Sequence, residues 1–248
     1  MFPRCRSVIK GGSLDINSIT KPLFGEAKDV VITWFSVLSQ GPKAIEKLDL
    51  GASSTVLFAL RFLLYVALID FAVAIPFLVS SGVKYDDEVF IAASLATNYI
   101  ESLSVALILY GALKLFGGKG RVEECVAAFC LLSAYLPLAA ILRLPTVPIQ
   151  VRAIDTSANF PEAIRQSAVS LLQLSHWDLA VFLLSDLLAT AVFVLFFINV
   201  FRCFRRLHAL PKLKALLAFA LGLLCAFGFV MAFLMPFEGA IDRAFGSK

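Results

Sequence analysis

Three carboxylates, Asp70, Glu101 and Asp186, lie inside long apolar stretches of the sequence. Ionisable side chains at membrane depth are rare and mark ion pathways or buried polar contacts. Each lies about 15 residues, or roughly 22 Å of α-helix, from the end of its stretch that we predict to face the cytoplasm. The three could therefore share one level and form a proton or cation site. The alternative, which we favour, is that each makes hydrogen bonds between helices, with the hydroxyl groups of Ser102, Ser133 or Tyr135 among the partners.

The elements that would position these residues follow from composition. Apolar residues make up 60% of the 248 residues and charged residues 16%, against about 45–50% and about 25% in soluble domains. This excludes disorder and argues against a soluble enzyme. The excess falls into five stretches, at about 55–80, 89–116, 122–142, 177–201 and 215–235. Each is long enough to span a bilayer as a helix and lacks the alternation of barrel strands.

We therefore predict an all-α polytopic membrane protein with five transmembrane helices. Residues 1–54 would form a cytoplasmic N-terminal region and 55–248 the transmembrane domain. Pro76 and Pro137 fall within the first and third stretches, where we expect kinks whose freed carbonyl groups find partners on neighbouring helices. We expect at least two of the three carboxylates to face the interior of the bundle.

Lys and Arg are distributed unequally between the two predicted sides. Fifteen lie in 1–54 and in the connections around 113–121 and 202–214, whereas six lie in the other connections and the C-terminal segment. Cytoplasmic loops carry the excess of Lys and Arg, so the N-terminus is predicted inside and the C-terminus outside. The first fifteen residues have no apolar core typical of a signal peptide, so we expect the first span to act as its own insertion signal.

Two further segments have the periodicity of amphipathic helices. Before the first span, apolar residues recur at helical spacing up to Gly41-Pro42, at Ala27, Val30, Val31, Trp34, Phe35 and Leu38. This pattern predicts a helix lying either on the cytoplasmic membrane surface or against the protein's own spans, with equal weight. In the outside loop, the cap at Asn159 and the apolar spacing beyond it predict a second short helix at about 160–174.

Motifs for catalysis, metal binding or cofactor binding are not found in the sequence. The two histidines, His176 and His208, are predicted near opposite membrane faces and cannot share a metal ion. Gly117, Gly118 and Gly120 flank Lys119 without the spacing of a phosphate-binding loop, so we expect a tight cytoplasmic turn. We therefore expect no catalytic residues, no metal and no cofactor. Nucleic acid is not expected as a partner either, because no basic stripe with interleaved aromatic residues is present.

A resemblance to a known family lies around this turn. The segment Tyr110-Gly111-Ala112-Leu113-Lys114-Leu115-Phe116-Gly117-Gly118-Lys119-Gly120 leads into Arg121-Val122-Glu123-Glu124-Cys125, and Ala134-Tyr135-Leu136-Pro137-Leu138 follows. Over about residues 105–142 this resembles the Yip-domain family, and Pro42 is similar to the proline that the family carries before its first span. The resemblance implies five spans with a cytoplasmic N-terminus and no established catalytic residues. Eukaryotic members act in membrane trafficking with small GTPases, but the N-terminal region here favours a bacterial inner-membrane member.

These observations favour a non-enzymatic protein with a scaffolding, partner-binding or membrane-organising role. Its expected partners are the lipid bilayer and other membrane proteins, or further copies of itself. The alternative is a small ion or proton channel or transporter subunit that uses the carboxylates at mid-membrane depth. An intramembrane enzyme is disfavoured because no nucleophile, base or metal constellation is found in the sequence.

Overall fold

The computed structural model describes residues 16–80, 88–146 and 175–234, and the regular elements in these ranges are helices. Five of them are long and apolar enough to cross a membrane. They are Ser53–Ile75, Ala92–Leu115, Val122–Thr146, His176–Leu207 and Lys212–Phe233. The predicted fold class, all-α with five membrane spans, is therefore confirmed. The helix predicted at about 160–174 lies outside the described residues.

The helix bounds agree with the apolar stretches to within a few residues, with one exception. The first two spans are α3 (Ser53–Ser80) and α4 (Glu88–Leu115). The last two are α9 (His176–Leu207) and α10 (Lys212–Phe229), and α10 continues into a π-helical turn, η2 (Val230–Leu234). The exception is α9, which runs past the predicted end at 201 through a turn that contains three arginines. Apolar composition alone marks the part of a helix in hydrocarbon, not its polar extension.

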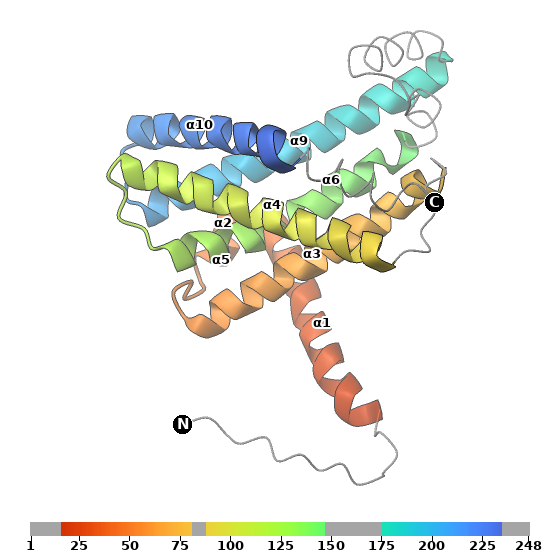
Figure 1. The fold of residues 1–248 in the computed structure, drawn as a ribbon, viewed down its shortest axis with the longest axis horizontal. Coiled ribbons are helices and arrows are strands. Elements are labelled where there is room, and N and C mark those ends of the chain that lie inside the picture. Colours follow the sequence, from red (N-terminus) through yellow and green to blue (C-terminus); the bar gives the residue numbers. More distant parts are fainter. Residues whose placement is uncertain (1–15, 81–87, 147–174, 235–248) are drawn as a thin grey trace.

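The third span occupies the centre of the bundle. Of its apolar window 67% is buried inside the protein, against 17–28% in the other four spans. It consists of α5 (Val122–Leu132), α6 (Tyr135–Arg143) and a 3-10 turn, η1 (Leu144–Thr146). In Figure 1, α5 and α6 follow one another through the bundle, and they contact α3, α4 and α9, while α10 packs on α4. Fully buried Ala127 and Ala128 on α5 suit this position, because small residues let helices approach closely.

The break between α5 and α6 has its cause in Pro137. Proline lacks the N–H that would bond to the carbonyl four residues earlier, here that of Ser133. The Ser133 carbonyl instead accepts a hydrogen bond from Leu136 N at 2.9 Å. The neighbouring carbonyl of Ala134 accepts one from the indole nitrogen of Trp34 at 2.7 Å. The expected interruption of the third span is therefore present, with a side chain from the N-terminal region as one of the partners. Pro76 lies within α3, which continues to Ser80.

The N-terminal region supplies α1 (Ile16–Gln40) and a single-turn helix, α2 (Pro42–Ile45). The predicted end of the helix at Gly41-Pro42 is confirmed. Gly41 has a φ of 56°, a value that residues with a Cβ atom rarely adopt. In Figure 1, α1 (red) lies across the direction of the spans and leaves the bundle, with only its C-terminal turns near the other helices. Val30 and Val37 are buried there, whereas Val31 and Phe35 of the predicted stripe are exposed. The predicted stripe is therefore divided: Val30, Trp34 and Leu38 pack against the bundle, whereas Val31 and Phe35 do not.

Candidate functional site

Two of the predicted carboxylates lie in one cavity. Asp70 of α3 and Glu101 of α4 line a space of about 320 Å³, together with Asn98 and Ser102 of α4. Apolar side chains from five helices complete the lining, and they are Leu63, Val66, Ala67, Val105, Phe129, Leu136, Phe193, Phe196 and Phe197. One carboxylate oxygen of Asp70, Oδ1, is buried without a hydrogen-bond partner. The cavity thus has a polar wall from α3 and α4 and an aromatic wall from α5 and α9.

The third carboxylate, Asp186, is not among the residues that line this cavity. Its Oδ1 lies 3.4 Å from Nη2 of Arg143 at the end of α6, and both side chains are about half exposed. The predicted level counted residues back from 201, but α9 extends to Leu207. Asp186 is therefore farther from that end than the apolar stretch suggests. The structure brings together Asp70 and Glu101 and places Asp186 in a separate ion pair.

Tyr135, which the sequence offers as a hydrogen-bond partner for a carboxylate, holds the end of α1. Its hydroxyl donates a hydrogen bond to the carbonyl oxygen of Val37 at 3.2 Å. The same hydroxyl accepts one from Nδ2 of Asn199 on α9 at 3.1 Å. Asn199 in turn lies beside Gly41, where an added Cβ would meet Nδ2 at 3.4 Å. Together with the bond from Trp34 to Ala134, these contacts form what we call the α1 anchor: Trp34, Tyr135 and Asn199.

The predicted glycine turn between α4 and α5 wraps around His208. Gly117 has a φ of 88°. A Cβ added at Gly118 would collide with Nδ1 of His208, and one added at Gly120 would lie 3.0 Å from Cδ2 of the same ring. The backbone N–H of Lys119 donates to the carbonyl oxygen of His208 at 3.1 Å. The turn thus joins the α4–α5 connection to the α9–α10 connection, and the end of the bundle that contains both is called the basic end below.

His208 is fully buried in this turn. Its Nε2 lies 3.2 Å from Sγ of Cys125, and its ring is 5.6 Å from that of Tyr110. Burial lowers the pKa of His208, the positive charge of Lys114 lowers that pKa further, and Glu124 acts in the opposite direction. The neutral imidazole is thus the form that this environment favours. From the sequence, His208 was considered only as one of two histidines that cannot share a metal ion, and its packing role was not predicted. The closely spaced glycines were the signal that a side chain packs against them.

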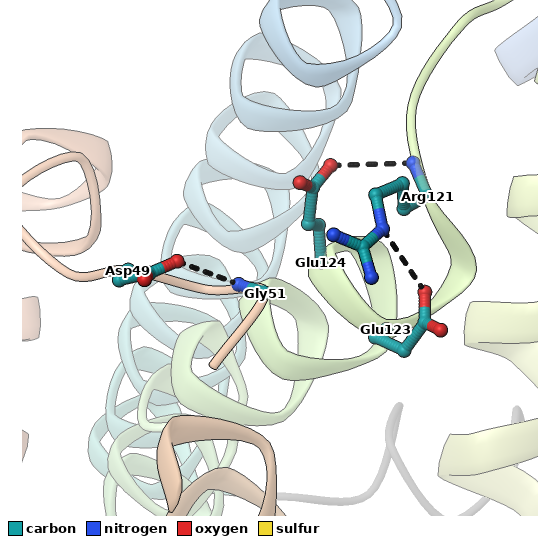
Figure 2. Close-up of polar contacts among 5 residues, drawn as sticks. All are labelled: Asp49, Gly51, Arg121, Glu123 and Glu124. Carbon is teal, nitrogen blue, oxygen red and sulfur yellow. Dashed lines mark hydrogen bonds and ion pairs between the residues drawn. The ribbon is translucent and has the colours of Figure 1, made fainter. Parts of the chain in front are cut away.

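A second hollow lies at the basic end, next to the contacts drawn in Figure 2. Glu124 accepts a hydrogen bond from the backbone N–H of Arg121 at 3.2 Å, and the Arg121 side chain pairs with Glu123 at 3.8 Å. On the facing loop, Asp49 accepts a bond from Gly51 N at 3.2 Å. The hollow has a volume of about 340 Å³. Its lining includes an ion pair between Glu46 and Arg206, with Asp49, Gly51, Glu124, Cys203 and the apolar residues Ile45, Leu48, Leu50 and Leu207. Ion pairs this exposed contribute little to stability.

The five spans and the buried polar contacts between them define the class of this chain: it is a polytopic α-helical membrane protein. Compared with family models, curated proteins and solved structures, the chain matches none. The resemblance to the Yip-domain family stays a prediction. Among the described residues, no three His, Cys, Asp or Glu side chains are grouped so as to hold a metal ion.

Proposed function

We propose that the protein is a non-enzymatic membrane scaffold, similar to the Yip-domain family, that binds a partner or organises the membrane through α1. The proposal places it in a bacterial inner membrane, with the N-terminus in the cytoplasm and the C-terminus outside. The observation that carries it is the α1 anchor. Two hydrogen bonds, from Trp34 to the Ala134 carbonyl and from Tyr135 to the Val37 carbonyl, fix the end of an amphipathic helix to the centre of the bundle. A third, from Asn199 to the Tyr135 hydroxyl, holds that hydroxyl in place.

The exposed side of α1 is the surface that the anchored helix presents for binding. Val31, Ile32 and Phe35 are exposed, with 61% of Phe35 accessible, although they are large apolar residues on a helix that leaves the bundle. Such a surface needs a cover, which is either the membrane interface or another protein. A helix fixed at one end presents this surface in a defined direction, as a scaffold requires.

A photo-crosslinking experiment tests the proposal. A photoreactive amino acid at Phe35 should form adducts with a discrete protein, or with a second copy of this chain, in native membranes. The matched control is the same probe at Leu224 of α10, which is also exposed and apolar but lies in a span. At Leu224 we expect adducts with lipid and none with protein. We further expect Tyr135→Phe to weaken the adduct at Phe35. Lipid adducts alone at both positions would contradict partner binding through α1.

A second candidate function is a small ion or proton channel or transporter subunit. The cavity lined by Asp70 and Glu101 is the observation in its favour. Proton or cation flux into liposomes that contain the purified protein tests it. Flux that is lost in Asp70→Asn and Glu101→Gln, but kept in Asp186→Asn, would support transport. We expect no flux above that of empty liposomes.

A further inference from the structure

We propose that the cavity between α3, α4 and α9 binds a small lipophilic amine in its ammonium form. This binding requires neither a protein partner at α1 nor ion flux, so it stands apart from both proposed functions. The inference rests on the two unlike walls of the cavity, on its size and on its opening.

The polar wall supplies acceptors for a cationic head group. Asp70 and Glu101 bring carboxylates from two helices to one side of the cavity, and Asn98 and Ser102 add an amide and a hydroxyl. Oδ1 of Asp70 is buried without a hydrogen-bond partner. A primary ammonium group carries three N–H donors, as lysine does, and can meet several of these acceptors at once.

The aromatic wall faces the same space. Phe129 and Phe196 are in edge-to-face contact with centroids 5.5 Å apart. Phe197 makes similar contacts with Phe193 and Phe196, at 4.9 and 5.0 Å. All four rings line the cavity. Rings of this kind attract a cation that lies over a face and also accept the apolar body of an organic ligand.

An inorganic cation fits these walls less well than an organic one. Hard metal ions take six or more oxygen ligands, whereas most of this lining is hydrocarbon. The volume of about 320 Å³ equals that of roughly ten water molecules at about 30 Å³ each. That space is large for a single dehydrated ion. It suits an amine of roughly ten non-hydrogen atoms, such as an arylalkylamine.

The opening of the cavity indicates the route of entry. Asn98 and Phe193 line the cavity and are also exposed at the surface of the bundle, Phe193 by 45%. Both lie within membrane spans, whose outer surface meets lipid. A ligand that enters there has dissolved in the bilayer first, which selects amines with an apolar body.

Binding of two matched probes to the full chain in a mild detergent tests the proposal. The probes are 2-phenylethylamine and 2-phenylethanol, which have nearly the same shape but carry an ammonium and a hydroxyl group. Isothermal titration should show the amine binding at least about tenfold more tightly than the alcohol, because charge-assisted hydrogen bonds are stronger than neutral ones. Asp70→Asn and Glu101→Gln should each weaken amine binding by at least about tenfold and leave the alcohol unchanged.

Two further variants separate the cavity from general effects. Asp186→Asn removes a carboxylate that lies in a span but outside the cavity, so amine binding should remain unchanged. Phe193→Leu keeps an apolar side chain and removes a ring, and should weaken amine binding by about threefold. Variants are compared only if they elute as the parent does in size-exclusion chromatography. Equal affinity for the two probes, absence of binding to the folded parent, or an unchanged affinity in both Asp70→Asn and Glu101→Gln would each overturn the proposal.

Discussion

Replacing Tyr135 by phenylalanine should loosen α1 and lower the stability of the whole bundle. The change removes one hydroxyl, which donates to the Val37 carbonyl and accepts from Asn199. The Val37 carbonyl keeps a second hydrogen bond, from Gly41 N at 2.8 Å. Losing the bond from Tyr135 therefore costs little at this carbonyl. Asn199 is buried with 8% of its surface exposed and would retain a donor without an acceptor.

The expected magnitude follows from these two losses. Hydrogen bonds between spans contribute about 0.6 kcal/mol on average and up to about 1.7 kcal/mol. Removing the partner of a buried donor, and so leaving that donor unsatisfied, costs about 1–3 kcal/mol in all. We therefore expect Tyr135→Phe to lower the free energy of unfolding by about 1–2 kcal/mol. The double variant with Asn199→Leu should lose less than the sum of the single losses, because the orphaned donor is then gone.

The free energy of unfolding is measured by steric trapping or by titration with a denaturing detergent at equilibrium. Limited proteolysis of α1 gives the local effect, and cleavage should become faster in Tyr135→Phe. The control is Tyr65→Phe, because the hydroxyl of Tyr65 has no hydrogen bond within the described part of the chain. Equal stability and equal proteolysis of parent and Tyr135→Phe would refute the idea that these bonds anchor α1. Additive losses in the double variant would refute the pairing of Tyr135 with Asn199.

Three further predictions concern the basic end and the topology. Gly118→Ala should destabilise the protein by about 1–3 kcal/mol or more, because its Cβ would collide with Nδ1 of His208. Gly111→Ala, with open space around it, should be neutral or stabilising by up to about 1 kcal/mol in the same unfolding assay. The lowered pKa of His208 means that the folded state binds fewer protons than the unfolded state. The stability from neutral His208 is therefore complete above pH 6.5, the ordinary histidine value, and declines as the pH falls from there toward the folded pKa. His208→Gln should remove that slope in unfolding measurements between about pH 5 and 7, whereas His176→Gln, at an exposed site, should keep it. Alkaline phosphatase fused after residue 248 should be active and a fusion at 119 silent, and the opposite pattern would reverse the topology.

The spans were predictable because the bilayer imposes a simple requirement on the sequence. About 20 apolar residues must follow one another in each span, and α3, α4 and α10 begin or end within a few residues of those stretches. The break at Pro137 was predictable for a similar reason, since the missing N–H is a local property. The hydrogen bond from Trp34 to the neighbouring carbonyl of Ala134 was not predictable, because Trp34 lies a hundred residues away in the sequence.

The depth of the candidate site residues along their spans was predictable, but the direction in which their side chains face was not. Counting residues placed Asp70 and Glu101 at similar depth, and they line one cavity. The same count could not reveal which way Asp186 faces around α9, nor that Arg143 would pair with it. The side of a span that packs on other helices and the side that meets lipid are both apolar, so the spacing of apolar residues does not distinguish them. For that reason the aromatic wall of the cavity was also missed. The role of Asn199 was missed because its partner, Tyr135, lies on another span.

The cavity and the α1 anchor share the third span and α9. Leu136 lines the cavity and Tyr135 beside it holds α1. On α9, Phe196 lines the cavity and Asn199, one helical turn later, completes the anchor. Packed interiors transmit small displacements because they contain few voids. Linkage requires that if amine occupancy weakens the anchor, release of α1 weakens amine binding by the same factor. The titration of 2-phenylethylamine into Tyr135→Phe therefore measures the coupling directly, and an unchanged affinity would mean that the two sites act independently.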